Sequence, residues 1–174
     1  MSAKRILIDG RSGSGKTELA RAIVDARPRI QLVRLDDLYP GWEGLSAGSA
    51  AVPELLESGR WRAWDWAAGR PGEVHELDPL RPVLVEGVGA LSRASRALAD
   101  FTVWVELDDE TRKRRALDRD GELFAPHWER WAAQELEFIG REHPRGLSDI
   151  VVAGTDVAPA VAVILALTDS RVGQ

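Results

Sequence analysis

The feature that most constrains this chain is a glycine-rich segment near its start. Residues 10 to 17 read Gly-Arg-Ser-Gly-Ser-Gly-Lys-Thr, follow the apolar residues 6 to 8 and open an amphipathic stretch. Glycines let such a loop curl around phosphate oxygens, and the following helix N-terminus supplies partial positive charge. Lys16 is expected to contact the β- and γ-phosphates, and the Thr17 hydroxyl to ligate Mg2+. The sequence therefore predicts a Walker A phosphate-binding loop for ATP and Mg2+, formed by Gly10, Ser12, Gly13, Ser14, Gly15, Lys16 and Thr17.

A flexible Gly/Ser loop is the competing interpretation of the same residues. The chain holds 23 Lys and Arg residues together, and its lysines are Lys4, Lys16 and Lys113, so a lysine rarely falls at a given position by chance. A strand pattern before the loop and a helix pattern after it are the context that the motif requires. We therefore interpret residues 10 to 17 as a nucleotide-binding loop.

Composition limits the classes of protein that this sequence can represent. With 174 residues the chain suits one domain spanning residues 1 to 174, and the absence of cysteine excludes a disulfide scaffold, Cys-ligated zinc and thiol catalysis. Its net charge of −5 argues against general nucleic-acid binding. The first strand is predicted within a few residues of the start, and the longest apolar run, residues 157 to 167, contains Pro159. We therefore expect a cytoplasmic protein without a membrane segment, and the sequence leaves its oligomeric state open.

Five short apolar runs, separated by helical patterns, predict the fold class. The strands are expected at residues 5 to 9, 30 to 35, 83 to 86, 102 to 107 and 149 to 153. Helices are expected at residues 17 to 25, 52 to 58, 91 to 99, 110 to 119, 126 to 141 and 158 to 167. Continuous apolar strands alternating with helices indicate an α/β protein with a parallel sheet covered on both faces. Residues 41 to 51 are rich in Gly, Ser and Ala, and we expect them to form a mobile loop over the site.

Acidic residues follow two of the predicted strands, at the sheet edge where ligands of parallel sheets bind. Asp36 and Asp37 follow the second strand; they could accept a proton from a hydroxyl or hold a metal through water, or they could simply form a turn before Pro40. Glu86 ends the third strand, as the Mg2+-side acid of a phosphate-binding-loop enzyme does. We expect Thr17 and Glu86 to hold the metal, Glu86 through a water molecule.

The motifs at residues 10 to 17, 35 to 39, 64 to 66, 85 to 87 and 110 to 120 occur in an order that resembles the uridine kinase-like branch of the P-loop kinases. The resemblance implies a three-layer P-loop kinase fold with a five-stranded parallel sheet in the order 2-3-1-4-5. It implies transfer of the ATP γ-phosphoryl group to the hydroxyl of a small molecule, a nucleoside by default.

The same resemblance implies roles for individual residues. Asp36 is the base, with Asp37 as the fallback, and Tyr39 lies beside the acceptor. An acceptor-side segment of about residues 40 to 70 carries Trp64, Asp65, Trp66 and Arg70. A lid of about residues 112 to 125 brings Arg115 and Arg119 over the phosphates.

Several features allow more than one interpretation. Trp61, Trp64 and Trp66 could stack on a planar acceptor or belong to an amphipathic hairpin packed on the body. The basic run at residues 112 to 115 is, on spacing alone, more typical of a solvated helix face paired with nearby acids. His75, His127 and His143 lack metal-ligand spacing and predict no zinc site.

Two other functions remain open at the level of sequence. A nucleoside monophosphate kinase would want arginines near a phosphate acceptor, and Arg60, Arg62 and Arg70 could serve. A P-loop hydrolase or nucleotide-binding regulatory protein is the alternative from another class. The Asn-Lys-x-Asp guanine-reading motif does not occur in the sequence, which disfavours a GTPase.

Overall fold

A five-stranded parallel sheet forms the centre of the protein. The computed structural model describes residues 4–170. The sheet runs in the order β2-β5-β1-β6-β7, and its strands are β1 (Arg5–Asp9), β2 (Gln31–Arg34), β5 (Val83–Glu86), β6 (Phe101–Glu106) and β7 (Ile150–Ala153). Counted within this sheet alone, the order is 2-3-1-4-5. The predicted strands and the predicted three-layer P-loop kinase fold are therefore confirmed.

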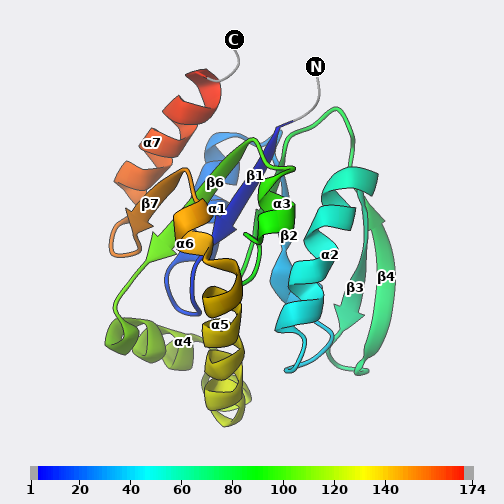
Figure 1. Ribbon diagram of the computed structural model, residues 1–174, viewed down its shortest axis with the longest axis vertical. Helices are drawn as coiled ribbons and strands as arrows, with labels where there is room; N and C mark the ends of the chain where they lie inside the picture. Colours follow the sequence, from blue (N-terminus) through cyan, green and yellow to red (C-terminus); the bar gives the residue numbers. More distant parts are fainter. Residues whose placement is uncertain (1–3, 171–174) are drawn as a thin grey trace.

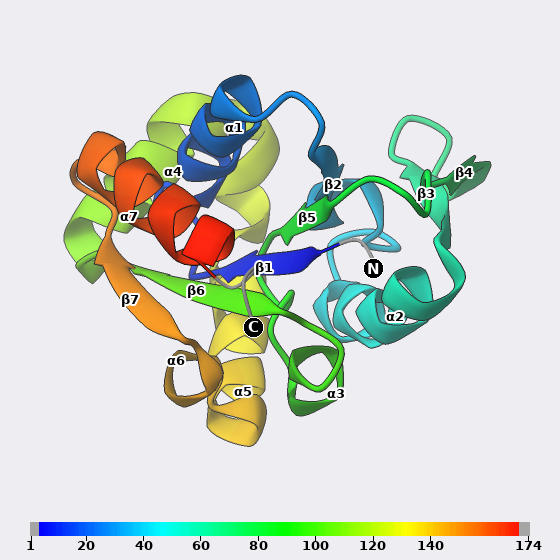
Figure 2. The same ribbon diagram turned by 90° about the horizontal axis from the view of Figure 1, so that it is seen from above.

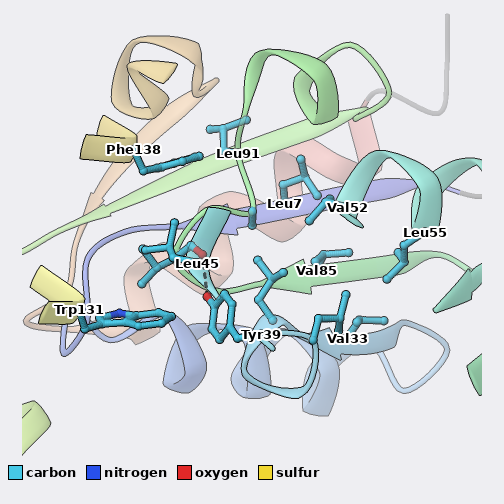
Figure 3. Close-up of a cluster of buried hydrophobic side chains, with 14 of the residues drawn as sticks. Leu7, Val33, Tyr39, Leu45, Val52, Leu55, Val85, Leu91, Trp131 and Phe138 are labelled. Carbon is cyan, nitrogen blue, oxygen red and sulfur yellow. Dashed lines mark hydrogen bonds between the residues drawn. The ribbon is translucent and has the colours of Figure 1, made fainter. Parts of the chain in front are cut away.

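Helices cover both faces of the sheet (Figures 1 and 2). One face carries α1 (Lys16–Ala26) and α7 (Val157–Ser170), and the other carries α2 (Leu45–Ser58), α3 (Arg93–Arg96), α5 (Trp128–Glu142) and α6 (Pro144–Leu147). Strand alternation divides the core accordingly, because Ile6 and Ile8 pack with the α1 and α7 side chains while Leu7 packs with the opposite cluster. Figure 3 shows this second cluster, which includes Tyr39 and Trp131.

The carboxyl ends of the strands lie on the side where α4 (Asp109–Phe124) and the N-terminal half of α5 are found, toward the bottom of Figure 1. Short 3-10 turns lead into this edge at η1 (Leu35–Asp37) and η2 (Ala125–His127). The expected ligand edge of the sheet is thus bordered by α4, η2 and α5.

The expectation of a mobile loop over residues 41 to 51 was wrong. Helix α2 begins at Leu45, and Leu45, Val52 and Leu55 are each at most 1 % exposed. The glycines that suggested a loop have packing roles instead, because a Cβ on Gly48 would lie 2.5 Å from Cδ1 of Tyr39. Tertiary packing therefore overrides the weak helix propensity of this segment.

Residues 60 to 76 form a separate antiparallel hairpin, as the second interpretation of the tryptophan cluster predicted. Strand β3 (Arg60–Asp65) pairs with β4 (Arg70–Glu76), and Figure 1 shows the hairpin at the side of the molecule beyond α2. Trp61 stacks on His75 of the facing strand, with ring centroids 4.4 Å apart.

Candidate active site

The loop between β1 and α1 has the backbone of a phosphate-binding loop. Gly13 and Gly15 have φ values of 77° and 101°, in the region that favours glycine. A Cβ on Gly13 would overlap the carbonyl oxygen of Arg112, so the loop lies directly against α4. The loop therefore needs glycine both for its turns and for close contact with the surrounding backbone.

Four polar side chains form a continuous chain across the carboxyl ends of β1, β5 and β2. The Thr17 hydroxyl donates to Oε1 of Glu86 over 2.9 Å, and Nε of Arg34 donates to the same oxygen over 3.3 Å. Nη2 of Arg34 also donates to Oδ2 of Asp36 over 2.9 Å. The predicted metal-side residues and the predicted base are thus neighbours joined by Arg34.

The oxygen atoms of Thr17 and Glu86 fit a Mg2+ ion shared with a nucleotide. Mg2+ prefers oxygen ligands and is usually held by one or two protein groups together with substrate phosphates. Within residues 4–170 no group of three or more His, Cys, Asp or Glu side chains is arranged to hold a metal by itself. A metal bound here would therefore depend on the phosphates for further ligands.

A cavity of about 590 Å³ brings many of the predicted site residues together. Its lining includes the predicted Ser12, Gly13, Lys16, Thr17, Asp36, Tyr39, Trp66, Glu86 and Arg119. Lys16 is 7 % exposed, and its Nζ donates to the Arg11 carbonyl over 3.0 Å. The phosphate-binding loop, both acids and one lid arginine thus face a single space.

The two neighbouring aspartates have different surroundings. Asp36 lines the cavity, and its side chain is 56 % exposed. Asp37 is also exposed but is not part of the cavity lining, and partial desolvation raises its pKa, with the charge of Asp36 adding to the rise and that of Arg34 opposing it. Of the two aspartates, Asp36 is therefore the one that faces the cavity.

Only one of the predicted acceptor-side hairpin residues lines the cavity. Trp66 is 41 % exposed, and its Nε1 donates to the backbone oxygen of Asp36 over 2.8 Å. Trp64 lies opposite Pro71, and Asp65 pairs with Arg70 in the last register position of the hairpin. Trp64, Asp65 and Arg70 do not line the cavity, because β3 ends at Asp65 and only the following turn reaches it. Their assignment to the acceptor side stays a prediction.

The two predicted lid arginines also separate. Arg119 lines the cavity and donates to Asp120 through Nε and Nη2. Arg115 instead donates to the Gly154 carbonyl over 2.8 Å and does not line the cavity. Arg115 is thus held beside the loop by the Gly154 carbonyl, close to Gly15, and its role at the phosphates stays a prediction.

Two charged residues that clamp the phosphate-binding loop were not predicted. Oε1 of Glu135 accepts the Ser12 backbone N–H over 2.8 Å, and Oε2 accepts Nε of Arg11 over 3.0 Å. Nη1 of Arg112 donates to the Ser12 carbonyl over 2.9 Å. Glu135 and Arg112 are 1 % and 2 % exposed, so the expected solvated face was wrong for Arg112. One signal was available: Glu135 occupies a position of the apolar stripe on α5 that also contains Trp131 and Phe138.

Asp9 is a further buried acid that the sequence did not single out. Its side chain is 0 % exposed and accepts the backbone N–H groups of Gly10, Gly89 and Leu91 over 2.7, 3.1 and 2.8 Å. Burial raises its pKa to about 7, against the lowering effects of these hydrogen bonds and of Lys16. Asp9 therefore joins the start of the phosphate-binding loop to the segment after β5.

Aromatic rings from three segments form the other wall of the cavity. Trp42 stacks on His127 with centroids 4.3 Å apart, and Tyr39 meets Trp131 edge-on at 4.8 Å. The Tyr39 hydroxyl donates to the Val88 carbonyl over 2.6 Å. Gln134 holds the backbone oxygen of Trp42 over 2.7 Å, which ties this wall to α5.

The fold and the phosphate-binding loop define the structural class as the P-loop kinase fold. A possible uridine kinase from Bacillus stearothermophilus is similar at a TM-score of 0.59 and 18% identity, covering 87% of this chain and 89% of that one. A gluconokinase from Sinorhizobium meliloti 1021 is similar at 0.59 and 21% identity, covering 98% of each chain. A shikimate kinase from Acinetobacter baumannii in complex with shikimate is similar at 0.58 and 17% identity, covering 99% of this chain and 96% of that one.

At these identities the structural comparisons establish the fold. The resemblance to P-loop kinases seen in the sequence is confirmed at that level. Comparison with protein-family models and with curated protein sequences found no match. In the part of the chain that the structure describes, none of the helices combines the length and apolar character needed to cross a membrane.

Proposed function

We propose that this protein is a Mg2+- and ATP-dependent kinase that transfers the γ-phosphoryl group to a hydroxyl of a small molecule, a nucleoside by family resemblance. The observation that carries the proposal is one cavity lined by Lys16 and Thr17 of the phosphate-binding loop, Glu86, Asp36 and an aromatic wall. Phosphoryl transfer depends on positioning and charge neutralisation, which these groups supply.

Different residues of the chain would bind the phosphate donor and the acceptor. Gly10, Ser14, Gly15 and neighbouring loop residues would hold the phosphates through backbone N–H groups, and Lys16 and Arg119 would neutralise their charge. Thr17 and Glu86 would hold Mg2+. Bound ATP would supply the phosphoryl group and Mg2+ would offset its developing charge. Asp36 would orient the acceptor hydroxyl and accept its proton.

A hydroxyl acceptor is supported over the phosphate acceptor of a nucleoside monophosphate kinase. The three arginines that such a kinase could use are on the hairpin and outside the cavity lining. Arg60 pairs with Glu76 over 3.1 Å, and Arg62 donates to the Gly72 carbonyl over 3.0 Å. Arg60 and Arg62 are therefore engaged within the hairpin itself.

The test is ADP release from Mg2+-ATP with panels of nucleosides, nucleoside monophosphates, sugars and vitamin-like alcohols, compared with a reaction without acceptor. Acceptor-dependent release supports the kinase, whereas equal release without acceptor supports a hydrolase or switch. Asp36→Asn should keep ATP binding and lose about 10²- to 10⁴-fold in transfer. Asp37→Asn is the matched control and should remain close to wild type; the opposite result would move the base to Asp37.

A further inference from the structure

The two halves of the cavity differ in charge. The Lys and Arg side chains that line it within residues 4–170 are Lys16 and Arg119. Lys16 is on the phosphate-binding loop, and Arg119 is bound to Asp120. Near the acceptor side, Arg34 is already shared between Asp36 and Glu86. The acceptor half thus presents the carboxylate of Asp36 and has no lining Lys or Arg of its own within residues 4–170; the basic side chain that lines it is His127, which stacks on Trp42.

The acceptor half offers ring surface in place of cations. Five aromatic residues, the imidazole of His127 and two aliphatic residues contribute to it: Tyr39, Trp42, Trp66, Phe124, Trp131, His127, Val88 and Leu123. Tyr39 and Trp66 have already used their polar atoms, since each donates a hydrogen bond to a backbone oxygen. Through these two side chains, a ligand meets apolar ring surface.

The position of Trp66 relates this surface to the reacting group. The bond from its Nε1 to the backbone oxygen of Asp36 fixes the indole beside the residue whose carboxylate would accept the proton. Trp42 lies 5.1 Å from it, centroid to centroid, at an interplanar angle of 59°. A ring placed on Trp66 would therefore bring an attached hydroxyl near Asp36.

An anionic acceptor would be poorly accommodated in this half of the cavity. Its carboxylate or phosphate would lose water against apolar rings and meet the negative charge of Asp36 without an uncommitted lysine or arginine to pair with. An uncharged ring pays neither cost and gains apolar and stacking contact.

We infer that the acceptor subsite takes an uncharged alcohol built on a flat or apolar-faced ring, and that it rejects carboxylated and phosphorylated acceptors. This inference rests on the proposed function and restricts its substrate class by charge. Selection arises from the ring wall and the acid together, with Trp66 as the stacking residue nearest to Asp36.

Binding of matched compounds tests the inference without requiring turnover. Equilibrium dialysis with Mg2+ and a non-hydrolysable ATP analogue would compare phenyl glucoside with phenyl glucuronide, methyl shikimate with shikimate, and uridine with UMP. At least one uncharged member should bind about tenfold or more tightly than its anionic partner. Tighter or equal binding by the anionic members would overturn the inference, as would failure of every uncharged ring alcohol to bind at millimolar concentration.

Variants separate the ring wall from general damage to the protein. Trp66→Ala should weaken the bound uncharged member about tenfold, whereas Trp61→Ala, which alters the same hairpin outside the cavity, should leave its affinity unchanged. Leu123→Lys places a cation at a cavity residue that is 80 % exposed, and it should raise affinity for the anionic members. No change in either Trp66→Ala or Leu123→Lys would contradict the inference.

Measuring ADP release with the same compounds separates the two proposals. Selective binding of uncharged compounds without acceptor-dependent ADP release would reject the kinase and retain the subsite. Efficient phosphorylation of a carboxylated or phosphorylated acceptor would retain the kinase and reject the subsite.

Discussion

Removing the carboxylate of Glu135 should destabilise the protein more than removing any exposed carboxylate on the same helix. Glu135→Ala leaves the buried N–H of Ser12 without its partner and removes the nearest buried counter-charge from Arg11 and Arg112, whose side chains are 17 % and 3 % exposed. Breaking a buried ion pair by deleting one member costs about 3–5 kcal/mol. Because Asp109 still pairs with both arginines, we expect the lower end, about 3 kcal/mol.

The assay is urea unfolding followed by circular dichroism, supported by thermal unfolding. A loss of about 3 kcal/mol corresponds to a fall in Tm of roughly 6–12 °C for a chain of this size. Glu137→Ala is the matched control on α5, because Glu137 is 77 % exposed and its ion pair with Arg141 should contribute less than about 1 kcal/mol. Glu135→Gln keeps an acceptor for Ser12 and should fall between the two. A loss for Glu135→Ala no larger than that for Glu137→Ala would refute the clamp.

Three further predictions concern packing and ionisation around the site. Gly48→Ala should destabilise by about 1–3 kcal/mol because its Cβ would overlap the Tyr39 ring, whereas Gly140→Ala, with open space around its Cβ, should stabilise by about 0.5–1 kcal/mol; urea unfolding of both variants is the check. Tyr39→Phe should cost about 1–3 kcal/mol, because the buried Val88 carbonyl loses its donor, and an unchanged unfolding midpoint would count against this. Burial raises the pKa of Asp9 to about 7, above its ordinary value of 3.8, so the folded state binds this proton more tightly than the unfolded chain does. Its contribution to stability is therefore complete below pH 3.8 and is lost as pH rises through about 7; carbon NMR titration should give a midpoint near 7, and one near 3.8 would be inconsistent with the buried site.

Local patterns were sufficient to predict the sheet and the phosphate-binding loop. The strands are short apolar runs, and the glycine positions within residues 10 to 17 indicate the conformation of the loop. Asp36 and Glu86 were singled out for the same reason, since Glu86 ends β5, Asp36 lies just after β2, and the carboxyl ends of these paired strands meet at one edge. Each inference needed only neighbours along the chain and the rule for parallel sheets.

The residues that the sequence did not reveal are placed by contacts between segments that are distant in the chain. Glu135 meets Ser12 across 123 positions, and Arg112 meets the same residue across 100 positions. In the sequence, Arg112 is one of several charges on a helix, and neither its burial nor its partner is encoded nearby. The prediction for the start of α2 was wrong for a related reason, because the packing partner of Gly48 is Tyr39 on another segment.

The hairpin has a practical consequence that follows from its placement. It forms its own two-stranded sheet beside α2, and among its residues and those of its connecting turn, only Trp66 lines the cavity (Figure 1). The phosphate-binding loop is held by Glu135 and Arg112, which belong to other elements. Under the proposed function, exchanging the turn after β3 would alter the acceptor side and leave the residues that hold the phosphate-binding loop unchanged, so this hairpin is a suitable unit for chimeras.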